Sequence, residues 1–432
     1  MCVSFNGISM LKNKKNRRPV AGALMVGFAA GFLLCGYEFV RSVSTSLFIG
    51  AYGAHNLPFV MTLAPLGTFG MVWGYGVLLS RFGSRQTLFL TSVLSGGGIL
   101  ACYGGILSGF HPAIGVLYVL REAYIVLIIE QYWSFINSVL RDDQGRKYNG
   151  PICGIASVGA ICGGLIVGQT AKVIGSEHLL IFAGLSLLPA AVLAWWAYGL
   201  GGVPVQEPEK RGKLALGLFR DIPTLRYLAG LIFVTQMVSA VLDLRFSGLV
   251  EAALPMQDER TAYLGYFYAL LNGCAFVFQF GVAPLLLHFV SLRTAHLGIP
   301  VVHLITCGVL LAYPTLTTGA LAYLVFKTLD YSVFRAAKEL LYIPLSFDVR
   351  YRAKEVIDAF GYRASKGMTS GLIALAGTIS YRVFNIGRLP GSVYPLVALG
   401  ALGVWSWIAW AITRSEDDRG RRLRVSEEVA DL

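Results

Sequence analysis

Charged side chains inside long apolar runs are the residues of this sequence best placed to do chemistry. Seven basic residues lie within such runs, namely Arg121, Arg245, Lys327, Arg335, Lys338, Arg363 and Lys366. Acidic residues lie in the same runs or at their ends, namely Glu38, Glu122, Glu130, Asp243, Asp330, Glu339 and Asp358. A charge at the centre of a bilayer costs about 3 kcal/mol even on lenient scales, so these side chains should face protein or a wet cavity. The alternative is that they pair with one another, or extend to the membrane surface near a helix end.

The densest group of these charges lies in residues 327–339. Lys327 and Lys338 are eleven residues apart, which would return them to one face of an uninterrupted α-helix. The side chains that border this face are Asp330, Tyr331 and Phe334. A face with cationic, acidic and aromatic groups suits an organic anion that contains a ring. Arg335 and Glu339, four residues apart, could instead satisfy each other.

Other apolar runs carry polar residues spaced seven apart. These pairs are Tyr124 and Gln131, Glu130 and Asn137, Gln236 and Asp243, and Asn272 and Gln279. A spacing of seven returns to the same face of an α-helix, so each pair forms a polar stripe. Polar stripes on several helices predict a shared central cavity, which is typical of a transporter.

The composition indicates the elements that must position these groups. Of 432 residues, 55% are hydrophobic and 14% are charged, whereas ordinary globular domains carry roughly 25% charged residues. The apolar runs are 20–40, 57–79, 87–109, 113–137, 151–174, 179–200, 225–250, 263–287, 294–313, 317–345, 356–381 and 393–412. Each is about twice as long as a transmembrane β-strand. The sequence therefore predicts an all-α integral membrane protein with twelve transmembrane helices as two six-helix bundles.

A polar linker divides the chain into two halves. We expect a basic tail at 1–19, a bundle at 20–200, the linker at 201–224, a second bundle at 225–412 and a charged tail at 413–432. Two short matches at a constant offset of 207 support an internal repeat. They pair Leu78–Ser84 with Leu285–Ser291, and Gly164–Ile166 with Gly371–Ile373.

The distribution of basic residues predicts the orientation in the membrane. With the N-terminus inside, the inner loops and tails hold 24 of the 36 basic residues and the outer loops hold 5. This bias predicts that both termini are cytoplasmic and that the number of spans is even. We expect the membrane to be the inner membrane of a bacterium. The bias also accounts for most of the +12 net charge without nucleic acid as a partner. The first apolar run is too long for a signal peptide and lacks a small-residue cleavage site, so we expect it to be retained.

Motifs for cofactors, metals and catalysis do not stand out. No two of the seven cysteines have CxxC spacing, and the sequence contains neither HExxH nor GxxxxGK[ST]. We therefore expect no cofactor, no metal site and no enzymatic activity. A transporter is the leading hypothesis, and a non-transporting membrane receptor is the alternative from another class. The sequence leaves the oligomeric state open.

The segment from Gly76 to Arg85 resembles the loop signature GxLxDRxGRR of the major facilitator superfamily, with Ser80 in place of its aspartate. This resemblance implies two six-helix bundles that rock about a central site. It also implies that Gly76, Arg81, Gly83 and Arg85 form a gating or conformational loop.

A narrower match covers residues 330–345, which resemble the F-x-x-x-K-E-x-x-Y-I-P-L run of ATP/ADP translocases of plastids and intracellular bacteria. Arg352, Lys354 and Asp358 continue it. The resemblance extends thinly over nearly the whole chain. It implies antiport of a small anion such as ATP or ADP, with Lys338 as a phosphate contact and functional acids at Glu122 and Asp243.

The chain departs from that family where two lysines are expected. Ser44 takes the place of the lysine that follows Arg41, and Ser247 takes the place of the lysine that follows Asp243. Arg121 and Arg245 could supply the missing charges.

The full set of predicted substrate contacts is Lys338, Glu122, Asp243, Lys327, Arg335, Arg41, Arg121 and Arg245. A second hypothesis keeps the fold but makes the protein a proton-coupled carrier of another solute, with Glu122 or Asp243 as the proton site.

Overall fold

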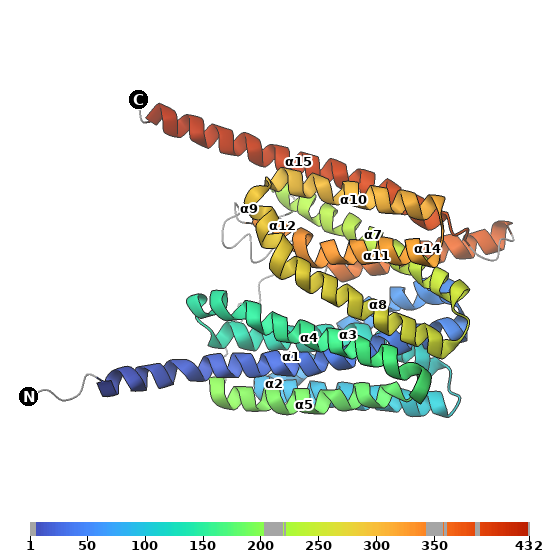
Figure 1. The fold of residues 1–432 in the computed structure, drawn as a ribbon, viewed down its shortest axis with the longest axis horizontal. Coiled ribbons are helices and arrows are strands. Elements are labelled where there is room, and N and C mark those ends of the chain that lie inside the picture. Colours follow the sequence, from blue (N-terminus) through green and yellow to red (C-terminus); the bar gives the residue numbers. More distant parts are fainter. Residues whose placement is uncertain are drawn as a thin grey trace, which may run out of the picture. The chain divides into compact units, whose positions relative to one another are not determined.

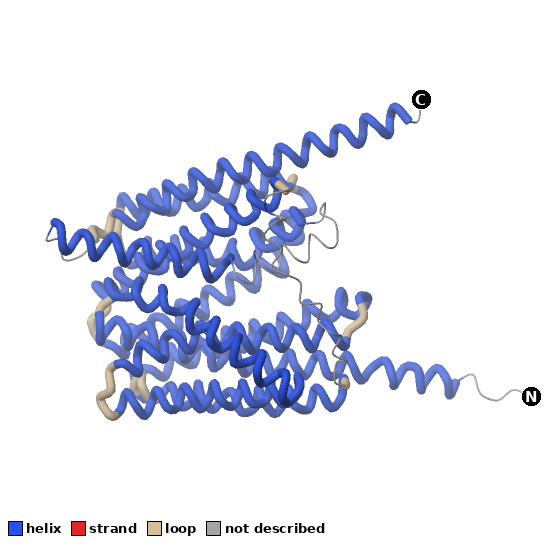
Figure 2. Tube along the Cα trace, turned by 180° about the vertical axis from the view of Figure 1, so that it is seen from behind, coloured by secondary structure: helices blue, strands red, loops and turns tan. Residues whose placement is uncertain are grey.

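The computed structural model describes residues 6–202, 219, 222–342, 357, 361–384 and 389–430. Side chains in these ranges are described except at 6–17, 142, 384 and 415–430. The described residues form helices and short connections with no strand, as Figure 2 shows. The prediction of an all-α protein is therefore confirmed for this part of the chain.

The helices group into two compact units, each described here by itself. The first unit consists of the described residues of Met1–Gly53, Leu63–Glu209 and Leu254–Gly273. The second unit consists of those of Ala54–Thr62, Lys210–Ala253 and Cys274–Leu432. Most of the predicted linker 201–224 and the motif residues Arg352, Lys354 and Asp358 lie outside the described residues.

In the first unit, α1 is the central element and packs against α3, α4 and α5 (Figure 1). The helices of this part of the chain are α1 (Asn6–Tyr52), α2 (Leu57–Leu107), α3 (Pro112–Val139), α4 (Asp142–Ile174), α5 (Leu179–Gly201) and α8 (Gln257–Val277). Ala23, Val26, Ala30 and Leu33 form a fully or nearly fully buried stripe of α1 at helical spacing. Small residues on α5 face the interior as well, which lets the helices approach closely.

In the second unit, α7 packs against α11, α14 and α15, and α10 packs against α11 and α15 (Figure 1). The elements are η1 (Ala54–Asn56), α7 (Pro223–Ala253), η2 (Phe278–Val282), α9 (Ala283–Phe289), α10 (Leu292–Ala312), α11 (Leu316–Leu329), η3 (Asp330–Phe334), α12 (Arg335–Tyr342), α14 (Tyr362–Phe384) and α15 (Val393–Ala430). The fully buried Trp405 anchors this packing, with its ring 5.2 Å from Phe334 and 5.7 Å from His303.

Within the described residues, nine helices are long and apolar enough to cross a membrane. The chain is therefore a multi-pass membrane protein. One of the nine spans 54 residues, from Ala54 to Leu107. A straight helix of that length would measure about 80 Å, far more than the roughly 30 Å hydrocarbon core. It is interrupted at Gly83, whose φ of 73° and ψ of 170° are not helical.

The break at Gly83 separates two of the predicted runs, 57–79 and 87–109. The runs 317–345 and 356–381 are not among the nine candidates, although the described parts of both are helical. The count of twelve transmembrane helices therefore stays a prediction.

The internal repeat has a local counterpart in the backbone. At the offset of 207, Gly83 corresponds to Val290, and both residues interrupt a helix. Val290 has a φ of −110° and a ψ of 135°, and α10 begins just after it with Ser291 as N-cap. The Ser291 hydroxyl accepts a hydrogen bond from the Thr294 amide, which satisfies one free N–H of the new helix. The two halves thus turn at equivalent positions by different backbone conformations.

Two of the helical segments, η2 and η3, are π-helical. Both belong to the second unit and lie against each other. A π turn places an extra residue in the helix, and such turns are frequent at functional sites. The η3 turn lies inside the cluster at residues 327–339 that carries most of the predicted chemistry.

Candidate functional site

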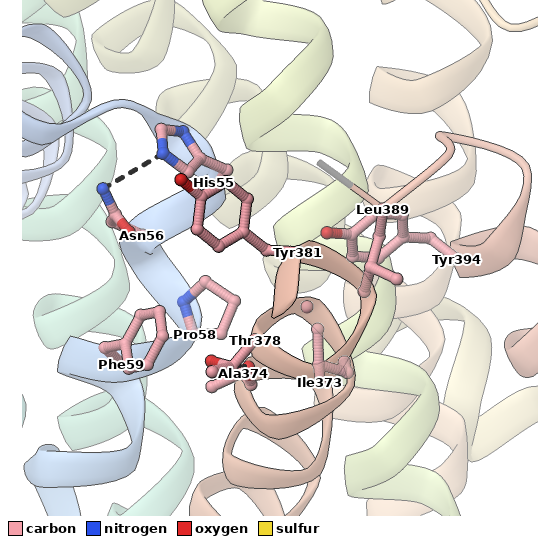
Figure 3. Close-up of a pocket in the computed structure, with 11 residues that line it drawn as sticks. His55, Asn56, Pro58, Phe59, Ile373, Ala374, Thr378, Tyr381, Leu389 and Tyr394 are labelled. Atoms are coloured by element: carbon pink, nitrogen blue, oxygen red, sulfur yellow. Dashed lines mark hydrogen bonds between the residues drawn. The ribbon is translucent and has the colours of Figure 1, made fainter. Parts of the chain in front are cut away.

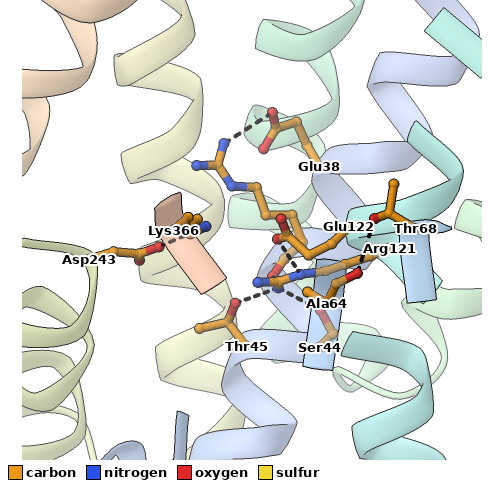
Figure 4. Close-up of polar contacts among 10 residues, drawn as sticks. Glu38, Ser44, Thr45, Ala64, Thr68, Arg121, Glu122, Asp243 and Lys366 are labelled. Carbon is orange, nitrogen blue, oxygen red and sulfur yellow. Dashed lines mark hydrogen bonds and ion pairs between the residues drawn. The ribbon is translucent and has the colours of Figure 1, made fainter. Parts of the chain in front are cut away.

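Arg121 is the centre of a polar cluster in the first unit (Figure 4). Its side chain is buried, with 4% exposed. Its Nη1 donates to the Arg41 carbonyl at 2.8 Å, the Ser44 hydroxyl at 2.7 Å and the Thr45 hydroxyl at 2.6 Å. The guanidinium also lies 3.8 Å from the centre of the Tyr118 ring, one helical turn earlier on α3.

The same guanidinium pairs with the predicted acid Glu122, because Arg121 Nε lies 3.3 Å from Glu122 Oε1. Arg121 thus brings a cation to Ser44, the position where ATP/ADP translocases have a lysine. All its hydrogen bonds to described residues come from Nη1, so Nη2 makes none with them.

A second ion pair lies on α1 next to this cluster. Arg41 Nη1 is 3.7 Å from Glu38 Oε1, and the Arg41 guanidinium lies 3.7 Å from the centre of the Tyr268 ring. Asn272, from the predicted polar stripe, donates to Glu38 Oε1 at 2.9 Å. The other carboxylate oxygen of Glu38 is buried without a hydrogen-bond partner among the described residues. The first unit therefore surrounds its cations with acceptors and rings, and leaves one carboxylate oxygen unsatisfied.

Lys327 is a buried cation of the second unit. It is 8% exposed, and its Nζ donates to the Ser239 hydroxyl on α7 at 2.8 Å. Three aromatic rings surround the ammonium, with centres 5.2 Å away for Tyr331, 5.8 Å for Phe326 and 5.9 Å for Tyr323. Lys327 forms no ion pair with any residue that the structure describes.

Lys338 is also buried, and its ammonium lies 5.2 Å from the centre of the Tyr362 ring. Its ion pair with Glu339 measures 3.9 Å, close to the limit for such a contact. The alternative of an Arg335–Glu339 pair does not occur, because Arg335 forms no ion pair with a described residue and is exposed.

Asp330 links the cations of this cluster. It is buried and interacts electrostatically with Lys327, Arg335 and Lys338. Its Oδ1 is buried with no hydrogen-bond partner among the described residues.

The expectation that Lys327 and Lys338 share one face assumed an uninterrupted α-helix, and that assumption is wrong. The π turn η3, Asp330–Phe334, lies between the two lysines. One extra residue rotates the following helix by about 100° relative to an α-helix. The two ammonium groups accordingly contact different rings, although both remain close enough to interact with Asp330.

Asp243 and Arg245, two residues apart on α7, lie in different surroundings. Asp243 Oδ2 lies 3.5 Å from Lys366 Nζ on α14 (Figure 4). Lys366 thus forms an ion pair with the predicted acid Asp243. The sequence had left open whether the charges inside the apolar runs pair with one another. Arg245 does not approach Asp243 or Ser247 within ion-pair or hydrogen-bond distance; its guanidinium packs against Gly391.

The predicted gating loop contains the Gly83 break. Gly76 and Arg81 are exposed, and the Arg85 guanidinium lies 3.9 Å from the centre of the Trp195 ring on α5. Arg85 therefore holds the beginning of the second part of α2 against α5.

Sequence reasoning missed several partners in these clusters. Tyr118 could have been found from its spacing of three to Arg121 on one helix face. Ser239 and Tyr268 could not, because they contact Lys327 and Arg41 from other helices. Metal binding finds no support, since no three His, Cys, Asp or Glu side chains cluster among the described residues.

Comparison with curated proteins confirms the sequence resemblance. The chain is 23% identical over 356 residues to ADP,ATP carrier protein 1 of Arabidopsis thaliana chloroplasts, which covers 73% of the chain and 55% of that carrier. It is 22% identical over 291 residues to ADP,ATP carrier protein 1 of Rickettsia bellii, covering 58% of each. A third relative, ADP,ATP carrier protein 1 of Chlamydia trachomatis, is 21% identical over 88% of the chain and 81% of the carrier.

Its curated relatives are ADP,ATP carriers. The chain spans 55% and 56% of the length of the two chloroplast carriers it matches. No protein-family model matches the chain.

Solved structures show the same type of fold. A POT family transporter has a TM-score of 0.65 at 13% identity, with 92% of the chain and 99% of the transporter covered. A bacterial homologue of the iron transporter ferroportin, in an inward-facing state, has a TM-score of 0.64 at 13% identity, covering 92% of the chain and 98% of that structure. Both neighbours are transporters with a fold similar to that of this chain, and the all-α membrane fold is thereby confirmed, while the twelve helices and the two six-helix bundles stay a prediction.

Proposed function

We propose that the protein is a secondary-active transporter that exchanges an anionic metabolite, with nucleotides such as ATP and ADP as the substrate class. Transport proceeds by alternating access through the central cavity that the sequence predicts. Both termini face the cytoplasm of a bacterial cell in this proposal, in agreement with the distribution of basic residues.

One observation carries the proposal: Lys327 is a buried ammonium that forms no ion pair with any described residue. Asp330 interacts with this charge but is shared with Lys338 and Arg335, so an anionic ligand can supply the charge that is missing when it binds. The three rings around Lys327 add surfaces on which a base can stack. Fold and relatives agree with this reading.

Lys338 extends the proposed site within the second unit. Its ion pair with Glu339 is long, at 3.9 Å, and it occupies the position that the family resemblance assigns to phosphate. Arg335 and Asp243, in the same unit, belong to the proposed site as neighbours that set its charge. In the first unit, Arg121, Arg41 and Glu122 stay predicted substrate contacts.

Uptake of labelled ATP and ADP by intact cells that express the protein tests this function. We expect uptake above that of control cells, and a fall of roughly tenfold to a hundredfold in Lys338→Gln, since a charged hydrogen bond contributes about 1.5 to 3 kcal/mol. The matched control is Arg382→Gln, because Arg382 is an exposed cation at the end of α14. No uptake of either nucleotide, with Lys338→Gln unchanged for every anion tested, would contradict the proposal.

A proton-coupled carrier is the second candidate, favoured by the unsatisfied oxygens of Glu38 and Asp330. A buried carboxylate with a free oxygen gains a hydrogen-bond donor when it is protonated. The sequence pointed instead to Glu122 or Asp243, but both are paired with cations. Uptake that follows an imposed pH gradient, and that Asp330→Asn makes independent of the gradient, would favour this candidate.

A further inference from the structure

Two adjoining pockets lie in the second unit, and Figure 3 shows residues that line the larger one. The larger has a volume of about 210 Å³ and the smaller a volume of about 150 Å³. They share His55, Leu389 and Tyr394 as lining residues. Together they reach the lower end of the roughly 300 to 1,000 Å³ typical of small-ligand sites.

The two pockets differ in chemistry. The larger is lined mainly by apolar and aromatic groups, including Phe59, Ile373 and Tyr381. The smaller contains Arg245 and Glu251. A ligand that fills both would place a charged group beside Arg245 and a flat or apolar body beside Tyr381.

Arg245 is the group that selects the charge of the ligand. Its Nε is buried without a hydrogen-bond partner, and the residue makes no hydrogen bond or ion pair with any described residue. Glu251 lines the same pocket, yet it does not pair with Arg245. The Tyr394 hydroxyl interacts electrostatically with the guanidinium.

Gly391 makes room for the guanidinium. A Cβ atom at this position would lie 2.7 Å from Arg245 Cζ, which real side chains do not allow. Any other residue at 391 therefore requires the Arg245 head to shift.

We propose that this double pocket binds a phosphate ester, with Arg245 holding the phosphate and Tyr381 and Tyr394 flanking the body of the ligand. A planar guanidinium matches phosphate through two parallel hydrogen bonds. The phosphate can belong to a free nucleotide or to a phospholipid headgroup. Neither the site nor the ligand class depends on which substrate the lysine cluster transports.

Photolabelling with 8-azido-ADP tests the proposal in the full-length protein, reconstituted in phosphatidylcholine nanodiscs. The parent protein carries Lys338→Gln, which weakens the proposed transport site, and the labelled peptides distinguish binding in the pocket from binding at that site. We expect saturable labelling of the peptides that contain Tyr381 and Tyr394. Arg245→Gln should weaken it tenfold to a hundredfold, and Gly391→Ala should weaken it while keeping the charge.

The matched control is Arg382→Gln, which removes an exposed cation one residue from Tyr381 and should leave the labelling unchanged. A second arm uses a photoactivatable phosphatidylglycerol in the same nanodiscs. Labelling by this lipid alone, lost in Arg245→Gln, identifies the headgroup as the source of the phosphate. Labelling that is equal in Arg245→Gln and its parent, or absent with both probes, would overturn the proposal.

Discussion

The two units treat their buried cations in opposite ways. In the first unit, Arg121 donates three hydrogen bonds, pairs with Glu122 and stacks on Tyr118. In the second unit, Lys327 has one hydroxyl and three rings but no carboxylate among the described residues. A cation that is satisfied by its own protein stabilises the fold, whereas one that is left unsatisfied is available to a ligand. The charge of a buried residue therefore does not by itself identify it as a binding residue. The partners of that charge within the protein must be known as well.

The largest expected effect is a difference in the free energy of unfolding between variants of Arg121 and of Lys327. Arg121→Met removes the donor of three hydrogen bonds and the partner of Glu122, so the free energy of unfolding should fall by about 3 kcal/mol. Lys327→Met removes a buried charge that forms no ion pair and has one hydrogen bond, so stability should fall clearly less than in Arg121→Met. Thermal unfolding of both variants in detergent checks this. Equal losses in the two variants would break the comparison.

The next effect concerns the equivalent breaks at Gly83 and Val290. The φ and ψ of Gly83 lie in a region that only glycine occupies readily, so Gly83→Ala should cost about 1 to 3 kcal/mol. Val290 has an extended conformation that any residue adopts, so its small-residue variant Val290→Ala should cost less than Gly83→Ala. Thermal unfolding again measures both. A smaller loss for Gly83→Ala than for Val290→Ala would show that the turn is not held by its backbone conformation.

Much of this architecture could be predicted, because lipid requires long apolar helices and a repeated loop motif marks the turn at Gly83. The environment of each charge could not. The spacing of Lys327 and Lys338 predicted one shared face, but the π turn at Asp330–Phe334 breaks that register. A π turn depends on packing against other helices, and no residue type signals it. Lys366 was expected to have a partner, yet only the structure shows that it is Asp243.

The smallest expected effect concerns this Asp243–Lys366 pair, whose side chains are 18% and 27% exposed. Partly exposed ion pairs contribute about 0 to 1 kcal/mol, so Lys366→Gln should change the unfolding temperature little. The charge-swapped double variant, with Asp243→Lys and Lys366→Asp, should recover what either single change loses. A double-mutant cycle on unfolding measures the coupling. A coupling of about 3 kcal/mol would show instead that this pair, like the contacts of Arg121, contributes strongly to folding stability.

The most direct test of the account is the affinity of purified, full-length protein for ADP, measured for the natural sequence and for Lys327→Met. We expect the dissociation constant to rise tenfold to a hundredfold in Lys327→Met while the unfolding temperature without ligand falls less than in Arg121→Met. The thermal shift at saturating ADP should shrink in parallel. An unchanged dissociation constant, or no binding of ADP to the natural sequence, would contradict the claim that the unpaired cation of the second unit holds the substrate.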